Sequence, residues 1–221
     1  MSNWFSGFRG WSPHKAFFVP LLCLSTALAL AQTPAAPESQ LQDAAAVLPS
    51  LLRGGYVIYM RHELTDVQDK SEGGDLNRCE TQRNLSAAGR AEASAVGRAI
   101  QALGVPVGSV YSSPFCRCKD TASLVFGRYE VMADLHFALD ASADERRRLA
   151  AALRTMLATS PAPGLNTVIV AHTANLREAV GIWPKPEGVA YVFRPLGDER
   201  FEPVARIMPG DWSTLAAAAK H

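Results

Sequence analysis

Arginine and histidine side chains follow three short apolar runs of this 221-residue sequence. Arg61 and His62 come directly after the run at 56–60, His172 follows the run at 167–171, and Arg117 lies just beyond a third run. A neutral imidazole is a nucleophile, and guanidinium groups bind phosphate oxygens through paired hydrogen bonds. A second imidazole can stabilise the charge that develops during transfer. These residue types therefore favour covalent transfer of a phosphoryl group through a histidine.

The three apolar runs are short and rich in β-branched and aromatic residues, which is typical of buried β-strands. The remaining pattern predicts further strands and four helices, and the expected strands are 56–60, 109–111, 130–132, 167–171, 189–193 and 201–207, with helices at 86–103, 119–126, 142–157 and 175–180. This order predicts a three-layer α/β/α sandwich with a mainly parallel sheet and a C-terminal β-hairpin. Ligands of such sheets bind beyond the carboxyl ends of the strands, where His62 and His172 are expected.

The N-terminal residues 1–31 have the layout of a secretory signal peptide. They contain Arg9 and Lys15 but no acidic residue, and they continue into an uncharged apolar run that ends in Ala-Leu-Ala at Ala31. This run is shorter than the ~20 residues of a membrane-spanning helix, although an uncleaved anchor is the alternative. We therefore expect cleavage near Ala31 and a periplasmic or secreted protein with no membrane span after cleavage.

Composition and charge limit the classes of function. The sequence is 48% hydrophobic, which excludes a disordered chain. Its net charge is +1, and removal of residues 1–31 leaves 190 residues at −1, so no basic surface for nucleic acid is indicated. We expect an Ala/Pro-rich tether at 32–49 that becomes helical towards Leu51, one catalytic domain at 50–212 and a C-terminal tail at 213–221. The oligomeric state is not indicated.

Cysteines provide a second indication of export. Removal of Cys23 with the N-terminal segment leaves Cys79, Cys116 and Cys118. Exported chains commonly form disulfides, so Cys79 is expected to pair with Cys116 or Cys118, leaving one thiol. The alternative is a zinc site from these three cysteines and His136, but the Cys-x-Cys spacing is unlike the usual zinc motifs. We therefore expect no metal.

Several sequence blocks resemble the histidine phosphatase superfamily, also called phosphoglycerate-mutase-like. The blocks are YMRHELTD, QRNLSAAGRAEA, VYSSPFCRCKDTA and TVIVAHTANL, and GVAYVFRP and RIMPGDW resemble the closing strands of an exported subgroup. Together they extend from about residue 55 to residue 212 and are jointly specific. The resemblance implies a phosphoric monoester hydrolase of the histidine acid phosphatase type, without a cofactor, that acts on a small phosphorylated substrate.

The resemblance also implies a role for each matching residue. His62 would be the nucleophile that becomes phosphohistidine, Arg61 and Arg117 would hold the phosphate oxygens, and His172 would complete the pocket. Arg83 stands where contacts on the substrate side often lie. A disulfide between Cys79 and Cys116, which flank the pocket motifs, would pin the polar loop beside the site.

Glu63 and Val189 are among the departures from the family pattern. Glu63 follows the nucleophile where glycine or alanine is usual, and Val189 stands where the subgroup often has a carboxylate. An alkoxide leaving group needs a proton donor. Glu187 is the first candidate for that donor, followed by Asp66, Glu63 and Asp134.

The leading hypothesis is an exported, metal-independent phosphatase that hydrolyses phosphomonoesters or phosphohistidine through a covalent intermediate on His62. The departures at Glu63 and Val189 motivate an alternative, a catalytically weak pseudo-phosphatase that binds phosphorylated envelope ligands. Phosphoglycerate mutase activity conflicts with export, because its substrate is cytosolic.

Overall fold

The computed structural model describes residues 40–66 and 74–219, which belong to a compact unit that spans residues 33–221. The expected signal peptide and most of the expected tether lie outside the described residues. Within the described ranges, no helix combines the length and apolar character needed to cross a membrane.

A six-stranded sheet forms the centre of this unit, in the order β3-β2-β4-β1-β5-β6. Its strands are β1 (Val57–Arg61), β2 (Val107–Ser112), β3 (Glu130–Val131), β4 (Asn166–Ala171), β5 (Ala190–Gly197) and β6 (Arg200–Ile207). The first four strands in that order pair in parallel, whereas β5 pairs antiparallel with both β1 and β6. The predicted mainly parallel sheet with a C-terminal hairpin is therefore confirmed.

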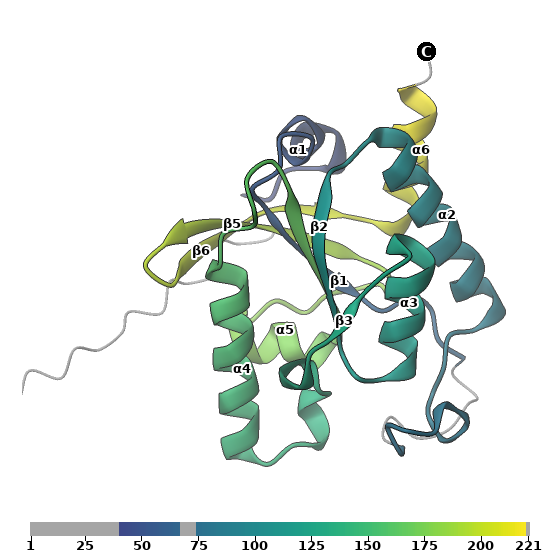
Figure 1. Cartoon of the computed structure of the whole chain (residues 1–221), viewed down its shortest axis with the longest axis vertical. Helices are drawn as coiled ribbons and strands as arrows, with labels where there is room; N and C mark the ends of the chain where they lie inside the picture. The colour runs from purple at the N-terminus through teal and green to yellow at the C-terminus, as the bar shows by residue number, and fades with distance from the viewer. Residues whose placement is uncertain (1–39, 67–73, 220–221) are drawn as a thin grey trace, which may run out of the picture. The chain divides into compact units, whose positions relative to one another are not determined.

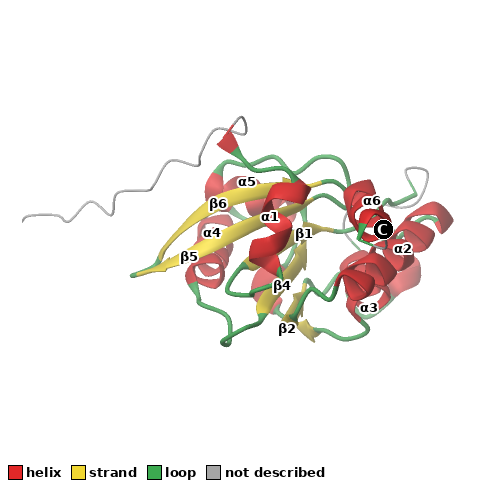
Figure 2. Cartoon of the chain, turned by 90° about the horizontal axis from the view of Figure 1, so that it is seen from above, coloured by secondary structure: helices red, strands yellow, loops and turns green. Residues whose placement is uncertain are grey.

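Helices cover both faces of the sheet (Figures 1 and 2). They are α1 (Ala44–Leu51), α2 (Ala87–Leu103), α3 (Cys116–Phe126), α4 (Ala143–Ala158), α5 (Thr173–Val180) and α6 (Pro209–Ala218), with 3-10 turns at Cys79–Thr81, Ala133–Leu135 and Ala138–Asp140. The helices α1, α2, α3 and α6 pack on one face, and α4 and α5 pack on the other. This arrangement is the predicted three-layer sandwich.

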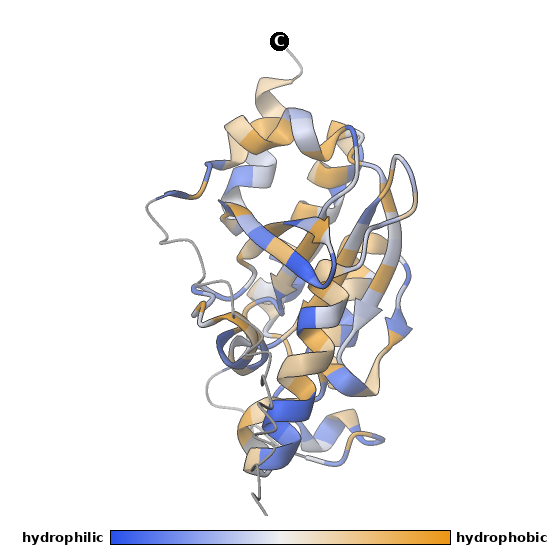
Figure 3. Cartoon of the chain, turned by 90° about the vertical axis from the view of Figure 1, so that its left-hand side faces the viewer, coloured by the Kyte–Doolittle hydropathy of each residue, from blue (hydrophilic) through white to orange (hydrophobic). Residues whose placement is uncertain are grey.

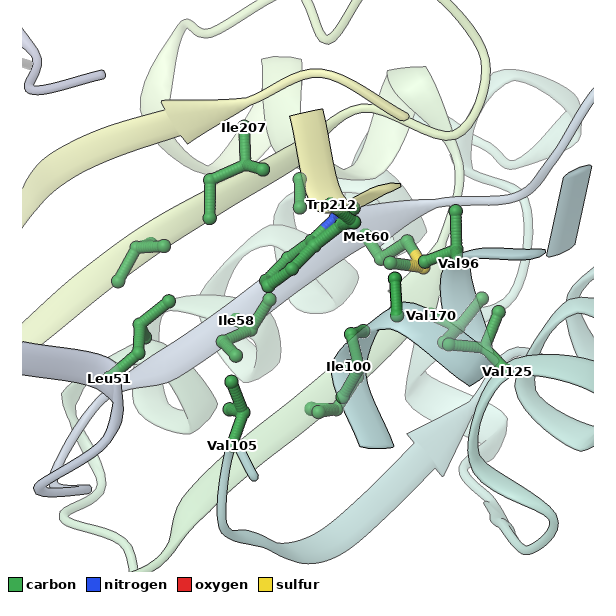
Figure 4. Packing of buried hydrophobic residues seen from close by; sticks show 14 of the residues in the cluster. Leu51, Ile58, Met60, Val96, Ile100, Val105, Val125, Val170, Ile207 and Trp212 are labelled. Atoms are coloured by element: carbon green, nitrogen blue, oxygen red, sulfur yellow. The ribbon is translucent and has the colours of Figure 1, made fainter. Parts of the chain in front are cut away.

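Side-chain alternation along β1 explains how one strand serves two cores. Ile58 and Met60 point into the cluster with α2 and α6, where Trp212 lies beside them (Figure 4). Val57 and Tyr59 point into the opposite cluster with α4 and α5. Successive side chains of a strand point to opposite faces, so an uninterrupted apolar run is buried on both sides.

The boundaries of two helices follow from their capping residues. The Ser86 hydroxyl accepts a hydrogen bond from the Gly89 amide at 3.0 Å, and the Ser142 hydroxyl accepts one from the Glu145 amide at 3.2 Å. α2 ends at Gly104, whose φ of 70° suits a residue without a Cβ. These caps confirm the expected starts of α2 and α4 and the end of α2.

The C-terminal end of the domain is more ordered than the sequence predicts, whereas the N-terminal end agrees with the prediction. The expected tail at 213–221 belongs largely to α6, where Trp212 and Ala216 are buried. This helix packs against α2 and is seen in pale orange next to the C-terminus in Figure 3. The end of the expected tether forms α1, the helix expected towards Leu51, which Asp43 caps at the Ala46 amide. Only the C-terminal helix was underestimated, because its sequence shows little alternation of polar and apolar residues.

Candidate active site

The expected site residues meet at the carboxyl ends of neighbouring strands. Arg61 ends β1, His62 follows it, and His172 follows β4, which is paired with β1. The two imidazole rings are edge-to-face with centroids 5.5 Å apart. The sheet order therefore brings together two histidines that lie far apart in the sequence.

One ring nitrogen of His62 is hydrogen-bonded to the backbone. Its side chain is buried, and Nδ1 lies 2.9 Å from the carbonyl oxygen of Glu63. A carbonyl only accepts hydrogen bonds, so Nδ1 carries the proton and Nε2 keeps its lone pair. Burial, followed by the charge of Arg117, lowers the pKa of His62 well below its usual value. The imidazole is therefore neutral at neutral pH, as a nucleophile must be.

His172 is fixed by three neighbours. Arg117 Nη2 donates to His172 Nδ1 at 3.2 Å, and Ser113 Oγ lies 2.8 Å from His172 Nε2. Since a guanidinium only donates, Nδ1 is the acceptor and Nε2 carries the proton. The Tyr59 hydroxyl donates to the His172 carbonyl at 2.6 Å. Burial and the charge of Arg117 lower the pKa of His172, so this ring is also neutral.

Arg117 is completely buried between His172 and two aromatic rings. Its guanidinium carbon lies 4.6 Å from the centroid of Phe115 and 5.5 Å from that of Phe137. The residue lies in the first turn of α3, which begins before the expected start of this helix at residue 119. The earlier start directs the side chain towards His172.

Arg61 organises the opposite side of the site. Its guanidinium donates to the Pro184 carbonyl at 3.2 Å and to the Glu187 carboxylate at 3.1 Å. The same carboxylate accepts hydrogen bonds from the amide and hydroxyl of Thr65 at 3.1 and 3.0 Å, and it lies 4.0 Å from His62 Nδ1. Glu187 therefore fixes Arg61 beside His62. Its expected role as proton donor remains a prediction.

Arg83 joins this group, with Nη2 at 3.8 Å from the Glu187 carboxylate. Of the other donor candidates, Asp134 is paired with Arg148 of α4 at 2.6 Å. A role of Asp66, Glu63 or Asp134 as the proton donor also remains a prediction.

A cavity of about 160 Å³ opens over the histidines. Its lining comprises four cationic side chains, the two imidazoles and a group of small or apolar residues, and the members are Arg61, His62, Arg83, Phe137, Leu139, His172, Thr173, Ala174, Arg177, Trp183 and Lys185. No carboxylate belongs to this lining among the described residues. The electrostatics of the cavity therefore suit a small anion.

Sequence reasoning missed Arg177, Trp183 and Lys185 at the mouth of the cavity. Arg177 lies one helical turn after Thr173 and Ala174, which also line it, and this i, i+4 spacing was an available signal. Trp183 and Lys185 lie in the loop before β5, and no motif in the sequence marks them.

Glu63 does not belong to the cavity lining, although it directly follows His62. Its side chain is fully buried against Gly188, where an added Cβ would lie 2.3 Å from Glu63 Oε2. Burial and the neighbouring carboxyl of Glu92 raise the pKa of Glu63 to about 8. Glu63 therefore does not repel a phosphate in the cavity, because its carboxyl is neutral at neutral pH and is turned towards Gly188.

We expect Glu63→Gln to change the pH dependence of stability. The native carboxyl retains its proton between about pH 4.5 and 8, where the unfolded chain has lost it. The contribution of this carboxyl to the free energy of unfolding therefore falls as the pH rises through that window, by at most about 1.4 kcal/mol per pH unit. An amide does not titrate, so Glu63→Gln removes this pH dependence. Urea unfolding at pH 5 and pH 8 should show Glu63→Gln gaining stability relative to wild type at the higher pH.

Glu130→Gln is the matched control, because Glu130 is exposed on β3. It should follow the wild type at both pH values. Parallel pH dependences of Glu63→Gln and wild type would show that Glu63 is ionised in the native chain.

A disulfide links Cys79 to Cys116 across 37 residues. It joins the 3-10 turn at Cys79–Thr81 to the start of α3, where the Cys116 amide also donates to Gln82 Oε1 at 2.8 Å. Of the two expected pairings, the structure contains the one with Cys116. Burial raises the pKa of the remaining Cys118 thiol to about 12.

The disulfide consumes two of the four ligands of the alternative zinc site. Throughout residues 40–66 and 74–219, no three side chains of the metal-binding types His, Cys, Asp and Glu converge on a common point.

Comparison with known proteins defines the class of this fold. The sequence profile of the histidine phosphatase superfamily (branch 1) matches residues 58–140, which include Arg61, His62 and Arg117. No curated protein has significant sequence similarity to the chain. The chain is similar in structure to the protein histidine phosphatase SixA complexed with tungstate, with a TM-score of 0.53, 16% identity, and coverage of 71% of this chain and 98% of SixA.

Two further solved structures have lower TM-scores. A mutant phosphoserine phosphatase from Entamoeba histolytica, in complex with phosphoserine, has a TM-score of 0.49 at 13% identity and covers 71% of this chain and 98% of its own. Mycobacterial glucosyl-3-phosphoglycerate phosphatase has a TM-score of 0.49 at 18% identity, with coverage of 69% of this chain and 98% of that phosphatase.

The fold is phosphoglycerate-mutase-like, as the likeness to SixA shows. The residues that the profile matches extend from β1 to the 3-10 turn at Ala138–Asp140, after β3, within this fold.

Proposed function

We propose that the chain is an exported phosphatase that hydrolyses small phosphomonoesters or phosphohistidine through a covalent intermediate on His62, without a metal. The family profile and the fold support a phosphatase. The observation that carries the proposal is the state of His62, whose Nδ1 is bound to the Glu63 carbonyl at 2.9 Å while the ring lines a cationic cavity. This leaves Nε2 as the nucleophilic atom.

In the first step, the Nε2 lone pair attacks the phosphorus and forms an N–P bond, while the ester P–O bond breaks. The departing oxygen takes the bonding electron pair and needs a proton, for which Glu187 is the first candidate. Arg61 and Arg117 balance the charge on the remaining phosphoryl oxygens.

In the second step, a water molecule attacks the phosphohistidine and forms a new P–O bond while the N–P bond breaks. The electron pair returns to Nε2, and inorganic phosphate leaves with the oxygen of that water. The proton lost by the water is accepted by the group that protonated the leaving oxygen. Neutral His62 is regenerated because its pKa is low.

The test uses the purified protein with p-nitrophenyl phosphate in the presence of EDTA. We expect hydrolysis that the chelator does not reduce, inhibition by vanadate, and an acid-labile, alkali-stable phosphate on the peptide that contains His62 after rapid quenching with labelled substrate. Loss of activity in EDTA and its return with zinc would contradict metal independence. Binding of vanadate without turnover would instead identify the pseudo-phosphatase.

Export rests on the layout of residues 1–31 and on the disulfide between Cys79 and Cys116, since disulfides persist in oxidising compartments. Mass spectrometry of the protein from its native cells should find an N-terminus just after Ala31. A mature chain that begins at Met1 or Ser2 would contradict export.

A further inference from the structure

The loop between α5 and β5 is fixed to the catalytic site at two points. Arg61 donates to the Pro184 carbonyl at 3.2 Å and to the Glu187 carboxylate at 3.1 Å. Lys185 lies between these two anchors, and Trp183 precedes them. The arginine next to the nucleophile therefore also sets the position of the side chains at the cavity mouth.

Trp183 brings two cations together at this mouth. The Arg177 guanidinium carbon lies 5.1 Å from the centroid of the indole ring, and Lys185 Nζ lies 5.3 Å from it. Cations at these distances are attracted by the ring. Trp183 is 44% exposed, so core packing does not explain a large aromatic residue here. Its position is explained by its contacts with Arg177 and Lys185.

The four cationic side chains that line the cavity form two groups. Arg61 and Arg83 both lie near Glu187, at 3.1 and 3.8 Å, next to His62. Arg177 and Lys185 form a second cationic pair on different elements, and both line the same cavity. Glu178 offsets part of the charge of Arg177. Lys185 still adds a positive charge beyond the inner group.

We propose that Arg177 and Lys185, held by Trp183, form a subsite for a second anionic group of the substrate. The preferred substrates are then small phosphomonoesters that also carry a carboxylate or another phosphate. This inference rests on the proposed phosphatase activity and names its substrate class. It also assigns Arg177 and Lys185 as residues that determine specificity and Trp183 as a positioning residue.

The test compares two substrates that share the same leaving group at carbon 6. We expect kcat/KM for 6-phosphogluconate to exceed that for glucose 6-phosphate by about ten-fold at low ionic strength, because only the former carries a carboxylate. This ratio should fall as salt is added, since these cations are near the surface. Arg177→Met and Lys185→Met should each reduce the ratio several-fold.

Trp183→Leu should reduce the same ratio while both cations remain. Arg98→Met is the matched control, because Arg98 is an exposed arginine of α2 and its loss changes the net charge equally. The control should keep the wild-type ratio.

Two failures of this experiment are distinguishable. Hydrolysis of p-nitrophenyl phosphate and both sugar phosphates with a ratio near one, or a ratio unchanged in Arg177→Met and Lys185→Met, would overturn the subsite alone. No hydrolysis of any of the three compounds would overturn the proposed function and, with it, the assigned substrate class.

Discussion

Replacement of His62 by alanine is expected to reduce kcat for p-nitrophenyl phosphate by at least about 10³-fold, since a nucleophile has no substitute among its neighbours. His172 has its Nδ1 occupied by Arg117 and its Nε2 proton directed at Ser113, so it cannot take over the attack. The variant should also lose the acid-labile phosphate on the enzyme. Initial rates of both proteins measure the fall in kcat, and rapid-quench labelling measures the loss of the phosphate on the enzyme.

Added imidazole provides the control for His62→Ala. A free imidazole in the vacated space supplies the missing nitrogen, so activity should partly return with increasing imidazole concentration. Circular dichroism should show the same fold for both proteins. A variant that retains more than about a tenth of wild-type activity would show that the nucleophile is another residue.

Arg117→Met is expected to reduce kcat/KM by about 100- to 1000-fold, because a charge that stabilises the transferred group is lost. A methionine can occupy the apolar space between Phe115 and Phe137. After burial, the charge of Arg117 is the largest cause that lowers the pKa of His62. Without it this pKa rises, so the acid limb of the pH–rate profile should move to higher pH.

Arg117→Lys separates charge from geometry. It keeps the positive charge, so it should leave the acid limb close to that of wild type, but it loses the forked donor and therefore part of the rate. Arg98→Met should match the wild type both in rate and in the position of the acid limb. An acid limb that does not move in Arg117→Met would show that the ionisation controlling the rate does not belong to His62.

Much of the fold could be predicted because its signals are local. The apolar run of β4 and the caps at Ser86 and Ser142 predict element type and position from a few neighbouring residues. α6 could not be predicted, because its sequence shows little alternation of polar and apolar residues and the helix is stabilised by packing of Trp212 on the rest of the core.

The candidate site likewise contains residues that could be predicted from the sequence and residues that could not. Arg61, His62 and His172 could be placed together because the carboxyl ends of parallel strands share one edge. Trp183 and Lys185 could not, because their position depends on how Arg61 holds a distant loop. Arg117 could be placed near this edge because it follows a third strand, but its buried contacts with aromatic rings depend on tertiary packing.

Because Glu63 contacts Gly188, the effect of a substitution at either position on stability depends on which residue occupies the other. A methyl group at Gly188 would lie 2.3 Å from Glu63 Oε2, so alanine at this turn is obstructed while the glutamate is present. With glycine at position 63 the obstruction disappears, and only the backbone cost of a φ of +78° remains. The order of substitutions therefore matters: a lineage that loses Glu63 first can vary the turn, whereas the reverse order passes through a less stable intermediate.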